Sequence, residues 1–139
     1  MRFVIFTSAL PFVALSAFAD VVPPPAKRNC DDAMSNLEMR QCALAEYQQA
    51  DQELNAVYQR ALKFLRETYG RDEIKQAGGQ DPSADLRDAQ KKWIAFRDAN
   101  CRSMGTQMLG GSGQETIVAG CLAEMTKDRT KELMTFLPD

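Results

Sequence analysis

The sequence predicts an all-α domain in which a long central helix packs against two shorter antiparallel helices, with disulfides stapling the bundle. Three separate segments carry apolar residues at helical spacing. After residue 19, no segment alternates with a period of two for long enough to indicate a strand. Four cysteines supply the material for two disulfides.

The chain begins with a segment typical of a secretory leader. Arg2 precedes an apolar run, and Ala17-Phe18-Ala19 matches the small-x-small pattern that signal peptidase cuts. We expect residues 1–19 to be a signal peptide, residues 20–29 an extended proline-rich segment and residues 30–139 the helical domain. No cysteine stands at the cut for lipid attachment, so we expect a periplasmic or secreted protein without a stable membrane anchor.

The long helix is predicted to run from about Asn36 to Gly70. Ser35 and Glu38 form a capping-box pattern, in which each side chain satisfies a free amide group at the helix start. Gly70 supplies the residue that most easily closes a helix. One face is predicted to be buried, and it contains Leu37, Leu44, Tyr47, Leu54, Tyr58, Ala61, Leu65 and Tyr69.

Two shorter helices follow. Residues 71–77 are charged and could add a helical turn, and the glycines at 78 and 79 then end it. Asp81 is predicted to cap the second helix, with Pro82 as its first residue. The apolar face of this helix is predicted to hold Leu86, Ala89, Trp93, Phe96 and Asn100. A third helix is expected from about Glu115 to Phe136, with an apolar face of Val118, Cys121, Leu122, Met125, Leu133 and Phe136.

The cysteines are Cys30, Cys42, Cys101 and Cys121. Their spacing matches neither a redox pair nor a zinc cluster, and an even number in an exported chain indicates two structural disulfides. Three pairings are possible. Pairing of Cys30 with Cys42 and of Cys101 with Cys121 is the simplest, because each bond then links a helix to an adjacent loop or helix.

The composition excludes several classes of function. The chain contains no histidine, which removes Ser-His and Cys-His nucleophiles and imidazole metal ligands. Without the leader, 16 basic residues face 19 acidic ones, giving a net charge of −3 and no basic block for nucleic acid. We therefore predict a protein that is not an enzyme, has no cofactor or metal, and binds a protein partner, preferably a cationic one. The sequence favours no particular oligomeric state.

Three charged residues interrupt the apolar faces, namely Asp51, Arg97 and Arg129. Because an unpaired charge in a core is costly, they form either an internal ion-pair network, which Asn55 could complete, or the floor of a site. The network is the favoured interpretation. It predicts that Asp51 is buried against one of the arginines and that replacing it with alanine would cost about 3 to 5 kcal/mol. A pocket converging on the three charges would favour an enzyme instead.

A larger set of positions shows a family resemblance. It consists of Cys30, Cys42, Tyr47, Ala50-Asp51, Leu54-Asn55, Tyr58, Ala89-Gln90, Trp93, Phe96-Arg97-Asp98, Cys101, Gly110-Gly111-Ser112, Cys121, Thr126, Arg129 and Leu133. As a set, these residues resemble the small exported LprI-type lysozyme-inhibitor family. The resemblance covers nearly the whole helical domain. It implies an LprI-like domain at residues 30–139 that inhibits lysozyme by protein-protein binding.

Two surfaces are candidates for contact with a partner. The candidate lysozyme-contact loop consists of Gly110, Gly111, Ser112, Gly113 and Gln114. Ser112 and Gln114 offer donors to a cleft lined by carboxylates, although a plain glycine turn between two helices is the simpler interpretation. An exposed stripe of Met34, Met39, Met104 and Met108 would instead favour a helical interaction or assembly module with a different envelope partner.

Overall fold

The computed structural model describes residues 30–76 and 78–138, and over these ranges it is helical without a strand. Its elements are α1 (Asn36–Thr68), α2 (Arg71–Gln76), α3 (Pro82–Gly105), the 3-10 turn η1 (Thr106–Met108) and α4 (Gln114–Met134). The predicted fold class is confirmed. The predicted signal peptide and proline-rich segment lie outside the described residues.

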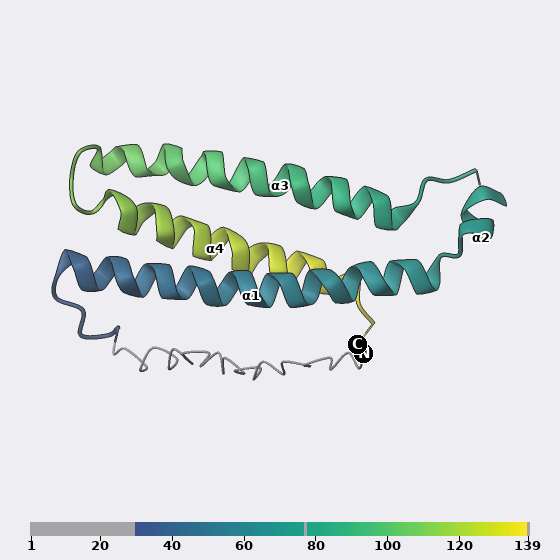
Figure 1. Ribbon diagram of the computed structural model, residues 1–139, viewed down its shortest axis with the longest axis horizontal. Helices are drawn as coiled ribbons and strands as arrows, with labels where there is room; N and C mark the ends of the chain where they lie inside the picture. Colours follow the sequence, from purple (N-terminus) through teal and green to yellow (C-terminus); the bar gives the residue numbers. More distant parts are fainter. Residues whose placement is uncertain (1–29, 77, 139) are drawn as a thin grey trace, which may run out of the picture.

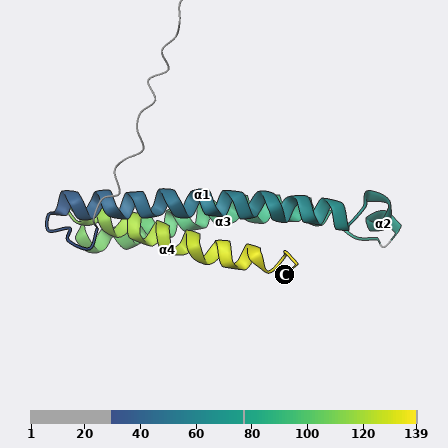
Figure 2. The ribbon, with the colours of Figure 1, turned by 90° about the horizontal axis from the view of Figure 1, so that it is seen from below.

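The helices form an elongated bundle. α1 and α4 run in the same direction and α3 runs against both, as Figure 1 shows. Figure 2 shows the same long, narrow arrangement from below, with α2 at one end and the α3–α4 connection at the other. α4 packs most extensively against α1 and also packs against α3, whereas α1 and α3 touch each other little. Among the described residues, no helix is long and apolar enough to cross a membrane.

The helix boundaries follow from their caps. The Ser35 Oγ atom accepts a hydrogen bond from the Glu38 amide at 3.2 Å, and the Glu38 carboxylate accepts one from the Ser35 amide at 3.0 Å, so the predicted capping box forms. α1 ends at Thr68, two residues before the predicted Gly70. α2, which the sequence indicated only as a possible turn, is followed by Gly78 in the left-handed conformation, with φ of 65°.

The large apolar core lies in the half of the bundle nearer α2. It consists of Leu54, Val57, Ala61, Leu62, Leu65, Leu86 and Leu133. The other half buries small residues, among them Ala50, Ala119 and Ala123, together with Cys101. Small residues let the helices approach closely but remove little apolar surface from water. We infer that the disulfides compensate at that end for a thin core.

The predicted apolar face of α3 is partly wrong. The buried residues are Ser83, Leu86, Gln90, Arg97, Cys101 and Gly105. Ala89 is exposed, and Phe96 is 60% exposed. The buried face of α3 carries polar side chains whose partners lie on α4. Apolar periodicity does not reveal a polar residue that is buried through a partner on another helix.

The faces of α1 and α4 also differ from the prediction. Leu37, Leu44 and Tyr69 are exposed, and Tyr69 lies just past the end of α1. On α4 the buried residues are Ala119, Ala123, Thr126, Thr130 and Leu133, while Phe136 lies beyond the helix and is exposed. The small residues Ala and Thr therefore form most of the buried face of α4, where the sequence indicated larger ones.

Candidate functional site

Arg97 lies where the three long helices meet. Its guanidinium donates a hydrogen bond to Thr126 Oγ1 on α4 at 3.1 Å and bonds Asp98 through Nε at 2.9 Å. Asp51 on α1 approaches the same guanidinium at 3.6 Å. The Arg97 side chain is buried, whereas both carboxylates lie at the surface. The arginine thus joins α1, α3 and α4 while its negative partners remain hydrated.

The Arg97 guanidinium also lies over two aromatic rings. Its carbon lies 5.4 Å from the centroid of the Tyr47 ring on α1 and 5.1 Å from that of Trp93 on α3. Arg129 approaches Trp93 as well, at 5.8 Å. A cation over an aromatic face is favoured, and more so when it is desolvated. Tyr47, Arg97 and Trp93 therefore form a clamp across the bundle.

The structure brings together three of the four residues of the predicted network. Asn55 donates a hydrogen bond to Asp51 at 3.0 Å, and Asp51 pairs with Arg97. Arg129 instead bonds Gln90 at 3.0 Å and Glu132 at 2.7 Å. The expected burial of Asp51 is wrong, because its side chain is 41% exposed.

This arrangement holds helices together rather than exposing reactive groups. Both arginines approach Trp93, but their polar partners differ: Arg97 pairs with Asp51, whereas Arg129 donates a hydrogen bond to Gln90. Within the described part of the chain, no group of three or more Cys, Asp and Glu side chains is placed to hold a metal ion. The contacts of Arg97 connect α1, α3 and α4.

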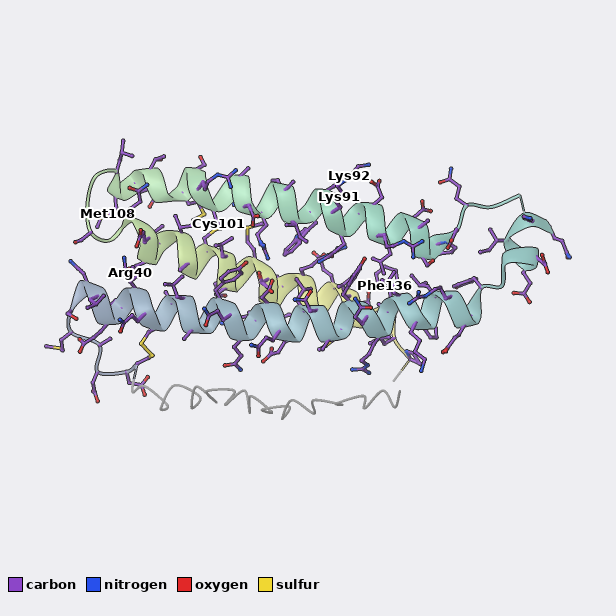
Figure 3. The ribbon with its side chains drawn as sticks, viewed as in Figure 1. Arg40, Lys91, Lys92, Cys101, Met108 and Phe136 are labelled. Atoms are coloured by element: carbon purple, nitrogen blue, oxygen red, sulfur yellow. A yellow bond between two sulfur atoms is a disulfide. The ribbon has the colours of Figure 1, made fainter. Side chains whose placement is uncertain are left out.

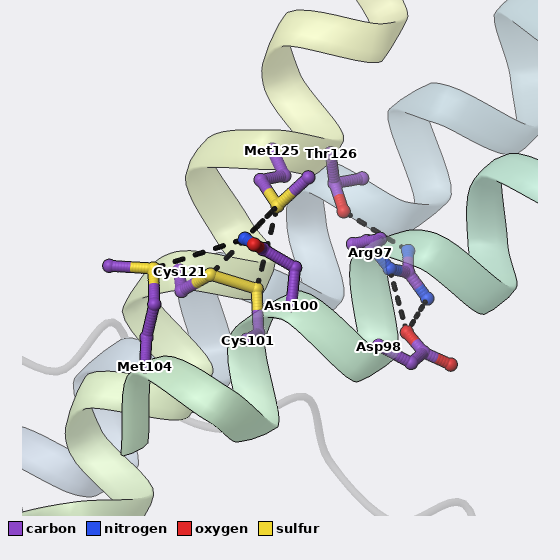
Figure 4. The surroundings of a disulfide bond; sticks show 8 residues. All are labelled: Arg97, Asp98, Asn100, Cys101, Met104, Cys121, Met125 and Thr126. Atoms are coloured by element: carbon purple, nitrogen blue, oxygen red, sulfur yellow. Dashed lines mark hydrogen bonds and ion pairs between the residues drawn. A yellow bond between two sulfur atoms is a disulfide. The ribbon is translucent and has the colours of Figure 1, made fainter. Parts of the chain in front are cut away.

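The two disulfides lie at the opposite end of the bundle from α2. Cys30 bonds Cys42 and ties the segment before α1 to that helix, while Cys101 bonds Cys121 and joins α3 to α4. These are the local pairings that the sequence favoured. Figure 4 shows Asn100 directed toward Met125, whose sulfur lies 3.4 Å from the Asn100 amide nitrogen and 3.6 Å from Cys101 Sγ.

The predicted contact loop is anchored to the start of α1. Asn36 on α1 donates a hydrogen bond to Ser112 Oγ at 2.7 Å, and Arg40 forms an ion pair with Glu115 just beyond the loop. Gly110, Gly111 and Ser112 are exposed, whereas Gly113 and Gln114 are half-buried. Gly110 has φ of 76°, a conformation that favours glycine.

Apolar side chains are exposed around this loop. All four methionines of the predicted stripe, Met34, Met39, Met104 and Met108, are exposed, and Met34 reaches 90%. Figure 3 shows Met108 at the end of the bundle where α3 connects to α4. Leu109, which the sequence did not single out, is 77% exposed. Leu109 stands beside the loop glycines and outside the predicted apolar faces of the helices, and this position could have indicated its exposure.

An open groove continues from this end along the flank of α1. Its volume is about 690 Å³, and the Cys30–Cys42 disulfide and Met39 line it. Glu46 and Thr116 also border the groove. The groove thus combines an apolar floor with a carboxylate, a composition suited to a side chain with an apolar stem and a positive head.

Two relatives are similar to this chain. Uncharacterized protein R02472 of Rhizobium meliloti (strain 1021) is 36% identical over 108 residues, covering 76% of each chain. Uncharacterized protein YecT of Escherichia coli (strain K12) is 24% identical over 118 residues, which span 79% of this chain and 69% of YecT. No solved structure matches the chain.

A family model supplies the assignment. The model described as Lysozyme inhibitor LprI matches residues 27–133. The match includes all four cysteines, the Arg97 clamp and the exposed loop. The chain therefore belongs to the LprI family of lysozyme inhibitors.

Proposed function

We propose that this protein is exported and inhibits a lysozyme by reversible protein-protein binding. The observation that carries the proposal is the family match over residues 27–133, since the family is one of lysozyme inhibitors. Charge supports it as well, because the chain after residue 19 has a net charge of −3 and lysozymes of the animal type are usually cationic. An acidic inhibitor is attracted to a basic enzyme before the two surfaces touch.

The exposed loop is the part of the molecule we expect to enter the enzyme cleft. A lysozyme cleft carries two carboxyl groups, so an inhibitory segment needs hydrogen-bond donors. Ser112 Oγ accepts a bond from Asn36, and a hydroxyl in that position keeps its own hydrogen free to donate. The bond to α1 holds the loop in one place, which lowers the entropy lost on binding.

The test is a lysis assay with the oxidised chain of residues 20–139. We expect the rate of cell-wall lysis to fall with increasing protein, with no change in the mass of either protein. Replacing Ser112 and Gln114 with alanine should weaken inhibition while the circular dichroism spectrum stays unchanged. Unchanged inhibition by this folded variant would limit the loop to a structural role.

A second function is favoured by the exposed methionines. Met34, Met39, Met104 and Met108 form the kind of adaptable surface that suits a helical interaction or assembly module with another envelope protein. The same assay separates the two functions. If micromolar oxidised protein slows neither animal-type nor bacterial lysozymes, the interaction module becomes the better interpretation.

A further inference from the structure

We propose that the enzyme docks on the whole disulfide end of the bundle, with the loop as only one part of that surface. This inference rests on the proposed inhibitory function and names the surface and the chemistry of its partner. We define the disulfide end as residues 30–53 and 97–127, and the α2 end as residues 54–76, 78–96 and 128–138. The partner surface is basic, with apolar contacts at its centre.

Charge is distributed unevenly between the two ends. The disulfide end contains nine acidic and four basic residues, a net charge of −5, whereas the α2 end contains eight acidic and ten basic residues, a net charge of +2. Figure 3 shows two of these cations, Lys91 and Lys92, on the side of α3 nearer α2. A molecule with this polarity approaches a positive partner with its disulfide end forward.

Local ion pairs leave the disulfide end negative. Lys127 bonds both Glu46 and Glu124, and these hydrogen bonds raise the pKa of Lys127 above its ordinary value. Arg40 is likewise engaged by Glu115. The four cations of this end are already included in its net charge of −5, so the end stays negative overall and attracts a basic surface at long range.

An apolar patch lies within this negative field. Met34 and Leu37 flank Asn36, and Met108 and Leu109 lie shortly before the loop; all four are exposed. The Asn36–Ser112 hydrogen bond joins the two segments that carry them. A β-carbon built on Gly113 would lie 3.0 Å from the end of the Met108 side chain, so Met108 also lies against the loop. Exposed apolar residues surrounded by charge are typical of a docking surface.

The neighbouring groove suits a basic side chain. An extended lysine or arginine of the partner could lay its stem along Met39 and the Cys30–Cys42 disulfide, with its charged head near Glu46. Both disulfides and the contacts of Asn36 and Arg40 hold the elements around this surface in place. A rigid surface loses little entropy on binding.

The experiment compares two variants with the same change in charge. The Leu37→Lys/Leu109→Lys protein adds two cations at the disulfide end, and the matched Tyr69→Lys/Met134→Lys protein adds two at the α2 end. All four positions are exposed, so circular dichroism should show folded proteins. We expect the first variant to inhibit at least about tenfold more weakly than the wild type, and the second to remain within about twofold of it.

The outcomes distinguish this inference from the proposed function. If the wild-type protein inhibits and both variants lose inhibition equally, only net charge matters and the disulfide-end surface is ruled out. If the wild-type protein does not inhibit, the proposed function fails and this inference fails with it.

A Leu37→Gln/Leu109→Gln protein removes the apolar contacts without adding charge. It should also inhibit more weakly than the wild type, and unchanged inhibition would contradict the apolar part of the surface.

Discussion

Arg97 on α3 donates a hydrogen bond of 3.1 Å to Thr126 on α4, and both side chains are buried. The guanidinium of Arg97 also lies over the rings of Tyr47 and Trp93. A buried guanidinium is tolerated only when its donors and its charge are satisfied. Here oxygen atoms of Thr126, Asp98 and Asp51 and two aromatic rings surround the cation, so a single side chain connects the three long helices.

Replacing Arg97 with alanine should lower the free energy of unfolding by about 3 kcal/mol, because Thr126 loses its donor and the space over two aromatic rings is left empty. Urea denaturation followed by circular dichroism measures the change. Arg97→Lys should lower the free energy of unfolding by less than Arg97→Ala, since lysine retains the positive charge although it lacks the planar guanidinium group. An unchanged denaturation midpoint in Arg97→Ala would mean that the clamp contributes nothing to stability.

Replacing Asp51 with alanine should lower stability by less than about 1 kcal/mol, the range of exposed ion pairs. The larger effect expected from the sequence assumed a buried Asp51, whereas the Asp51 side chain is 41% exposed and Asp98 also pairs with Arg97. Because both carboxylates serve one cation, the Asp51→Ala/Asp98→Ala protein should lose more than the sum of the single losses. Simple additivity in the same denaturation experiment would show that the two pairs act independently.

The sequence predicts helices better than it predicts their buried faces. The start of α1 and the cap of α3 are correct because the capping signals are local to Ser35, Glu38 and Asp81. The face of α3 is wrong because Gln90 and Arg97 are buried through partners on α4, and Phe96 is left outside. Such pairing depends on the contact between helices, which no single segment encodes.

In the candidate site as well, local features are predictable from the sequence and contacts between distant segments are not. The loop predicted at residues 110–114 is visible in the sequence as a glycine cluster, but the structure ends it one residue earlier: Gln114 is the first residue of α4, and it and Gly113 are half-buried. Its attachment to Asn36 and the neighbouring exposure of Leu37 and Leu109 depend on how the start of α1 lies beside the α3–α4 connection. Those features depend on the folded structure and could not be predicted from the sequence alone.

Gly105 should not tolerate alanine. A β-carbon there would lie 2.6 Å from Val118 Cγ2, so the Val118 side chain or the helix backbones would have to shift near the Cys101–Cys121 disulfide. We expect Gly105→Ala to lower the free energy of unfolding by about 1 to 3 kcal/mol. Gly120 on α4 is the matched control, since a β-carbon there meets nothing within 4 Å. Gly120→Ala should leave stability unchanged or raise it by up to about 1 kcal/mol; equal losses in both variants would exclude the steric explanation.

Asp81 should make stability depend on pH in the acid range. The Asp81 carboxylate caps α3, and hydrogen bonding by the Ser83 side chain is the main cause that lowers the pKa of Asp81 from its ordinary value of 3.8. A lowered pKa in the folded state means that the stabilisation is complete above the unfolded value and is lost as pH falls through the folded value. The wild type should therefore lose more stability than Asp81→Asn on acidification below about pH 4. Parallel pH profiles of the two melting temperatures would contradict this role.

The most direct measurement is the inhibition constant of the oxidised chain, residues 20–139, against a cationic animal-type lysozyme at two salt concentrations. We predict reversible, saturable inhibition that weakens as added salt shortens the Debye length from about 30 Å to about 8 Å, because opposite charges favour association. Inhibition that is present but independent of salt would contradict the electrostatic part of the proposal. Full lysozyme activity at both salt concentrations, with both disulfides intact, would contradict inhibition of this enzyme class.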